Sequence, residues 1–152
     1  MPLARIAPRL ADDAPSIPAQ RRRVWVGPDV QSHDLIVLTH RELVLASLNG
    51  PPRPEIRAAA ELGDDLDELF GQLAVTVHLD RVRRARLDLV RNTAAIDYDG
   101  PGGRGRADVV FSTPEVADAF FTKLWRRLGT GFALAPYRRD GWALAAAPLG
   151  LC

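Results

Sequence analysis

The sequence predicts an α+β domain in which a seven-stranded antiparallel β-barrel is capped by a C-terminal α-helix, with a helical insert after the third strand. Three observations lead to this fold class. Short strand-like segments fill most of residues 24–111, a helical periodicity interrupts them at 54–73, and a strongly amphipathic helix follows at 114–128. Short antiparallel strands must close or be covered to bury their apolar faces. One helix with a wide apolar stripe, following the strands in the chain, can cover one open end of a curled sheet.

The first three strands are expected at 24–26, 35–39 and 43–46. Each is a run of aliphatic, β-branched or aromatic residues, and the second is apolar on both faces. Only a short polar link separates the second strand from the third, which predicts a hairpin. The segment 54–73 then repeats apolar residues at helical spacing, and Gly63 either divides it into two short helices or kinks one.

Four more strands are expected after the insert, at 75–79, 82–90, 94–98 and 107–111. Most of them alternate apolar and polar side chains, as half-buried strands do. The strand at 82–90 changes phase, because Val82 is even-numbered whereas Ala85 and Leu87 are odd-numbered. A bulge near Arg83 and Arg84 would restore one buried face and help the sheet to curl.

The helix at 114–128 is the clearest element. Either Ser112 and Glu115 form a capping box, or Thr113 caps the helix with Pro114 at its first position. Gly129 ends it. Its apolar residues form one broad stripe: Val116, Ala117, Phe120, Phe121, Leu124, Trp125 and Leu128.

The expected domain spans residues 21–129, preceded by an N-terminal arm at 1–20 and followed by a C-terminal tail at 130–152. The arm is rich in Pro, Ala and Asp and lacks periodicity. The tail is apolar with one polar break before Gly141, which fits either a terminal hairpin or an extended segment packed on the domain.

Whole-chain properties suggest a soluble cytoplasmic protein. The chain has 152 residues with a net charge of +1, so no global field draws it to nucleic acid. Cys152 is the single cysteine, which excludes an intrachain disulfide and suits a reducing compartment. Neither a signal peptide nor a transmembrane segment is expected, because no apolar run is long enough.

Three segments resemble a bacterial pleckstrin-homology-like (PH-like) or GRAM-like domain. Residues 35–46 resemble the family's hydrophobic–Thr–polar–Arg–x–hydrophobic hairpin. Residues 77–85 resemble the family's strand start, in which a leucine is followed by x-x-isoleucine. Residues 111–120 resemble the final strand with its closing helix. Trp125 stands roughly where eukaryotic PH domains often keep a helix Trp. The insert at 54–73 and the tail depart from the plain pattern.

The resemblance implies binding, in eukaryotic members often of phosphoinositides. That activity needs basic residues on the first strands and in the loop between them. Here the loop at 27–34 carries two Asp residues and neither Arg nor Lys. The remaining candidates for anion or lipid contact are Arg21, Arg22 and Arg23, whose simpler interpretation is a solvated start to a strand.

Other chemistries find little support in the sequence. The arginine-rich segment 81–91 lacks the interleaved aromatic residues of a nucleic-acid groove, and ion pairing with Asp80, Asp88 and the acidic segment 64–68 is expected instead. The acidic segment lacks EF-hand spacing. Residues 100–105 match G-x-G-x-x-G but precede a strand, so a hairpin loop is expected. His40 and His78 are expected at the surface, none of the three histidines has a partner at metal-ligand spacing, and no catalytic, metal or cofactor site is predicted.

The leading functional prediction is a non-enzymatic interaction module that binds protein, including copies of itself. Its candidate partner surface comprises the apolar residues of the insert and tail: Leu66, Leu69, Phe70, Phe132, Tyr137 and Trp142. These residues serve either packing or an interface. The alternatives are a peripheral phospholipid-binding domain acting through residues 21–23, and a small-ligand-binding barrel or an enzyme without a recognisable motif.

Overall fold

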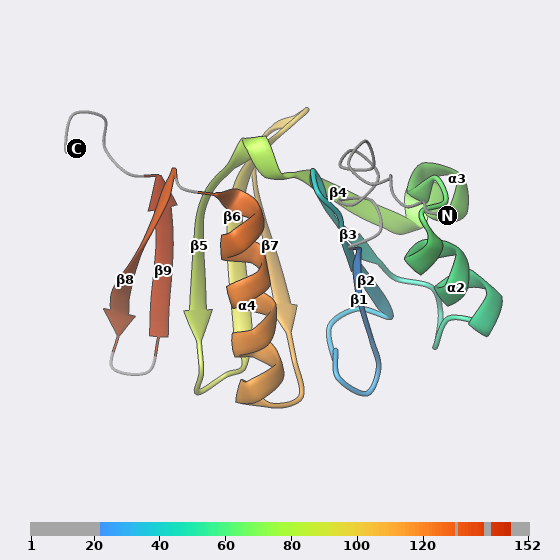
Figure 1. Ribbon diagram of the computed structural model, residues 1–152, viewed down its shortest axis with the longest axis horizontal. Helices are drawn as coiled ribbons and strands as arrows, with labels where there is room; N and C mark the ends of the chain where they lie inside the picture. The colour runs from blue at the N-terminus through green and yellow to red at the C-terminus, as the bar shows by residue number, and fades with distance from the viewer. Residues whose placement is uncertain (1–21, 130, 139–140, 147–152) are drawn as a thin grey trace, which may run out of the picture.

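The computed structural model describes residues 22–129, 131–138 and 141–146, and within them two antiparallel sheets account for all nine strands (Figure 1). The four-stranded sheet has the order β1 (Arg23–Val26), β2 (Leu35–Leu38), β3 (Glu42–Ala46) and β4 (Ala74–His78). The five-stranded sheet has the order β7 (Gly103–Val110), β6 (Thr93–Gly100), β5 (Val82–Asp88), β9 (Gly141–Ala146) and β8 (Phe132–Arg138). The short 3₁₀ turn η3 (Leu79–Arg81) connects β4 to β5. The N-terminal arm at 1–20 and the end of the tail at 147–152 lie outside the described residues.

The prediction of a closed seven-stranded barrel is wrong, because the two sheets do not close on each other and two further strands are present. These strands are β8 and β9, which form the terminal hairpin. Strand β9 pairs with β5 over residues 84–88, so the two neighbours of β5 are β6 and β9, and β5 does not pair with β4. The sheet therefore extends outward through β8 instead of curling into a barrel.

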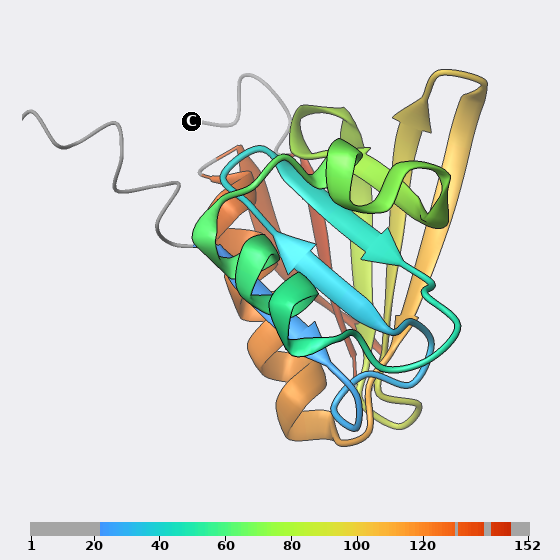
Figure 2. The same cartoon turned by 90° about the vertical axis from the view of Figure 1, so that its right-hand side faces the viewer.

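The four-stranded sheet is buried on both faces, because β2 and β3 are apolar on both. One face carries Ile36, Leu38 and Leu45 into the main core, and the other carries Leu35 and Val37 into a second apolar cluster. Two helices, α2 (Pro54–Leu62) and α3 (Leu66–Phe70), cover that second face before the 3₁₀ turn η2 (Gly71–Leu73) leads into β4 (Figure 2). Gly63 ends α2 and so divides the insert into these two helices. Its backbone is in the left-handed conformation, with φ of 106°.

Helix α4 (Pro114–Leu128) fills the main core between the sheets. The Thr113 side chain caps it by accepting a hydrogen bond from the Val116 amide at 3.2 Å, which settles the choice between the two expected caps. The Phe120 ring lies at the centre of the core, 5.1 Å from Trp25 and 4.9 Å from Phe111 between ring centroids. Trp25 of β1 and Phe111, which directly follows β7, thus pack on one helical side chain.

Two local features position the strands around this helix. The register of β5 against β6 shifts between Val82 and Arg84, which confirms the bulge expected there. The loop after β1 reaches the end of β7, where Val30 bridges to Phe111 and the Ser32 hydroxyl accepts a hydrogen bond from the Val110 amide at 2.9 Å. This loop joins the two sheets at one end of the molecule.

Candidate functional site

The apolar side chains of the insert belong to the second core cluster. Leu66 and Phe70 are only 6% and 4% exposed, and they pack with Ala60 beneath the helices. Leu69 is half-buried against the same cluster. Of the two roles considered for these residues, packing is the one that their burial supports.

The three arginines proposed for lipid contact do not act as one group. Arg21 lies outside the described residues. The Arg22 guanidinium donates hydrogen bonds to the carbonyls of Ala60 and Asp64, at 3.1 and 2.9 Å, at the C-terminal end of α2. A cation there also complements the helix dipole, so Arg22 has a structural role. Arg23 is exposed, and it lies on the same face of β1 as Trp25, which packs against Phe120 of α4.

The β8–β9 hairpin carries an apolar surface beyond the helix. Trp142 lies opposite Leu87 in the register and Leu134 opposite Leu144, so both share the face of the sheet that lines the core. Helix α4 packs on β5 and β6, and the hairpin stands to its side (Figure 1). Trp142 and Leu134 consequently remain 38% and 37% exposed.

The other tail residues named in the sequence differ in placement. Phe132 packs against the main core, and its carbonyl accepts a hydrogen bond from the Trp125 indole at 3.1 Å. Tyr137 belongs to β8, and its side chain lies outside the described residues. Leu134 was missed, because its exposure depends on the register between β8 and β9, and no pattern in the tail reveals that register.

Strand β8 is an edge strand without charge along its first half. Residues 132–135 read Phe-Ala-Leu-Ala, and Ala133 and Ala135 are exposed. The edge strand β7 carries Arg104, Arg106 and Asp108, and the edge strand β1 begins with Arg23. The fourth edge, β4, shares a cavity of about 570 Å³ with the β6–β7 hairpin. Proteins usually protect edge strands with charges, bulges or a covering element, and in β8 such devices are confined to the second half, where Pro136, Arg138 and a register shift between them occur.

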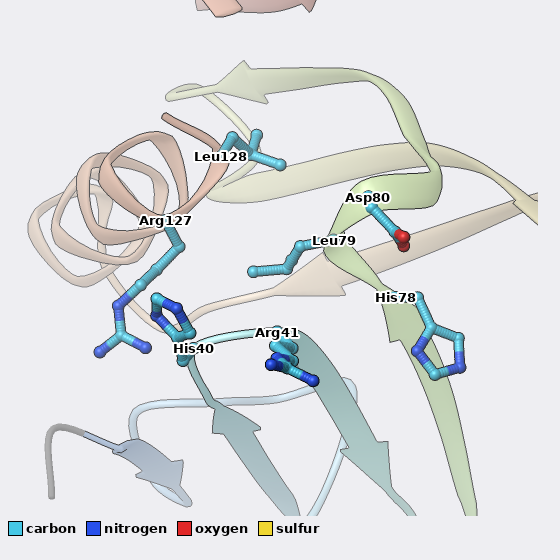
Figure 3. A pocket seen from close by; sticks show the side chains of 7 residues that line it. All are labelled: His40, Arg41, His78, Leu79, Asp80, Arg127 and Leu128. Carbon is cyan, nitrogen blue, oxygen red and sulfur yellow. The ribbon is translucent and has the colours of Figure 1, made fainter. Parts of the chain in front are cut away.

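A second candidate site is a polar pocket of about 520 Å³ at the C-terminal end of α4 (Figure 3). The turn between β2 and β3 contributes His40 and Arg41, η3 contributes Asp80, and the end of α4 contributes Arg127. In Figure 3, Asp80 lies across the pocket from Arg127. Sequence reasoning placed His40 at the surface, where it is, but nothing in the sequence indicated that these segments converge.

Positive charge continues from this pocket along α4. The pKa of Lys123 is lowered, chiefly by the charge of Arg23 and then by desolvation and by Arg126 and Arg127. A cation's pKa falls in this way when like charges outweigh nearby carboxylates. The C-terminal half of α4 and the start of β1 therefore form one basic patch.

Arginines of the segment 81–91 form ion pairs within the five-stranded sheet. Arg84 pairs with Asp97 at 3.3 Å and Arg83 with Asp99 at 3.9 Å, both across to β6. The expected partners, Asp80, Asp88 and the acidic segment 64–68, are not the ones that these two arginines use. The glycine-rich motif forms the β6–β7 turn, as expected, with Gly100 opposite Gly103.

No family model matches the sequence, and no curated protein matches it. The likeness to PH-like domains therefore stays an interpretation of sequence patterns. Among the described helices, none combines the length and apolar character needed to cross a bilayer. The described part of the chain also contains no cluster of three or more potential metal-ligating side chains.

Proposed function

We propose that this chain is a non-enzymatic interaction module that associates with a second copy of itself through the edge of β8. The observation that carries the proposal is the uncharged stretch Phe132–Ala135 on an unpaired sheet edge. Backbone N–H and C=O groups on such an edge can accept another strand. Antiparallel pairing of β8 with its own copy is self-complementary, as a two-fold dimer requires.

The apolar face of the hairpin favours the same partner. Leu134 and Trp142 lie on the core-lining face next to this edge. When two copies pair through β8, these side chains from both copies meet across the junction and shield one another from water. A charged partner strand would leave that apolar area uncovered, which is why a second copy fits the surface better.

Sedimentation velocity over a range of concentrations tests the proposal. The wild-type chain is expected to shift from monomer to dimer as its concentration rises. Leu134→Arg places two like charges near the junction, one from each copy, and is expected to weaken association by about tenfold or more. The matched control is Leu62→Arg, because Leu62 is 82% exposed on α2, far from β8 (Figure 1).

A concentration-independent monomer would refute the proposal. Equal effects of the two substitutions would also refute it, because the loss would then not depend on the β8 edge. Circular dichroism of both variants establishes that each remains folded.

A further inference from the structure

The polar pocket combines nitrogen-bearing side chains with an apolar floor. Arg41 and Arg127 carry fixed positive charges, and His40 and His78 add imidazole nitrogens at the rim. Leu79, which is only 6% exposed, forms part of the wall. A cavity of about 520 Å³ is in the size range of small-molecule sites, which combine apolar walls with a few polar groups.

The main chain around the pocket is held in place before any ligand arrives. The Thr39 hydroxyl accepts hydrogen bonds from the amides of Arg41 and Glu42, at 3.1 and 2.9 Å, and fixes the turn. The Arg41 carbonyl accepts a hydrogen bond from the Leu79 amide at 2.8 Å, which ties the turn to η3. A rigid frame of this kind lowers the entropy lost on binding.

The charge balance of the site favours an anion. Asp80 is the one carboxylate among the described lining residues, and it lies across the pocket from Arg127 (Figure 3). Beside the lining, the Glu42 carboxylate lies 3.5 Å from Nδ1 of His78. Lys123 precedes Arg127 by one helical turn and adds to the same field. Among the described residues, neither Arg41 nor Lys123 forms a salt bridge.

We propose that this pocket binds the phosphomonoester group of a small molecule. Guanidinium groups donate paired, charge-assisted hydrogen bonds to phosphate oxygens, and Arg41 supplies such a group, while the charge of Arg127 adds to the field at the pocket. The apolar wall at Leu79 and Leu128 would contact the rest of the ligand. No Phe, Tyr or Trp lines the described pocket for base stacking, so a nucleic-acid strand fits less well. The site is separate from the β8 edge, and Arg23 belongs to the basic patch beside it rather than to its lining.

Titration of the ¹⁵N-labelled chain with phenyl phosphate, followed by NMR, tests the proposal. Saturable shifts are expected at the amides of Arg41, Leu79 and Leu128, with smaller affinity for inorganic phosphate. Arg41→Ala is expected to weaken binding about 10-fold or more, because it removes charge-assisted hydrogen bonds. Asp80→Asn is expected to strengthen it. Arg53→Ala is the matched control, since Arg53 is an exposed arginine that precedes α2.

A vesicle arm separates the two sources of a phosphomonoester. Co-sedimentation with vesicles containing phosphatidic acid, lost in Arg41→Ala and absent with phosphatidylcholine alone, would assign the group to a lipid headgroup. Binding of phenyl phosphate without co-sedimentation would assign it to a soluble ligand. Shifts that do not saturate, or that Arg41→Ala and Arg53→Ala change equally, would overturn the proposal. None of these results depends on self-association.

Discussion

Truncation of Phe70 tests whether the helical insert is part of the core. The side chain is 4% exposed and packs with Leu66 and Ala60 over the second face of the four-stranded sheet. Removing a buried phenyl ring costs about 3–5 kcal/mol, because transfer free energy is lost and a cavity remains. For a domain of this size that loss lowers Tm by about 6–20 °C. Thermal unfolding of Phe70→Ala followed by circular dichroism measures it.

The control for this experiment is Leu62→Ala on the same insert. Leu62 is 82% exposed, so its truncation is expected to change the free energy of unfolding by no more than about 0.5 kcal/mol. If Phe70→Ala were as mild as Leu62→Ala, the insert would not stabilise the sheet. Phe70 would then return to the candidate partner surface.

Two further predictions concern local interactions. Thr113→Ala removes the cap of α4 and is expected to lower the free energy of unfolding, measured in urea, by about 1 kcal/mol. Thr113→Ser keeps the hydroxyl and should retain most of that stability. Burial lowers the pKa of His33 from 6.5, partly offset by Asp34. The unfolded chain therefore binds the proton first, so this contribution to stability falls as pH drops from about 6.5 towards the lowered pKa. His33→Gln should flatten that part of the stability profile; an unchanged slope would contradict the assignment.

The local elements of this fold were readable from the sequence, whereas the closure of its sheets was not. Hydrophobic alternation and the phase change at Val82 predicted the strands and the bulge, because both depend on neighbouring residues. In the structure, the edge of β5 that does not pair with β6 is taken by another strand. The tail supplies that strand, and its sequence fitted a hairpin or an extended segment equally well. The long-range pairing of β9 with β5 thus lay beyond what the local patterns predict.

The candidate sites also depend in part on contacts between residues that lie far apart in the sequence. The two-faced apolar pattern of residues 35–38 was visible, and it requires a cover on each face. That requirement explains why Leu66 and Phe70 are buried rather than displayed. The pocket, in contrast, joins residues near 40, 80 and 127, which only the tertiary fold brings together. Composition and spacing carry no signal for such a convergence.

The pairing of β8 with a second copy of itself is tested most directly by isotope-filtered NMR on a mixture of labelled and unlabelled chains. Such spectra report only contacts between different molecules. We expect intermolecular cross-peaks that join residues 132–135 of one copy to the same residues of the other, and that disappear in Leu134→Arg. Intermolecular cross-peaks confined to another surface, or none at concentrations well above those used for sedimentation, would contradict self-association through this edge.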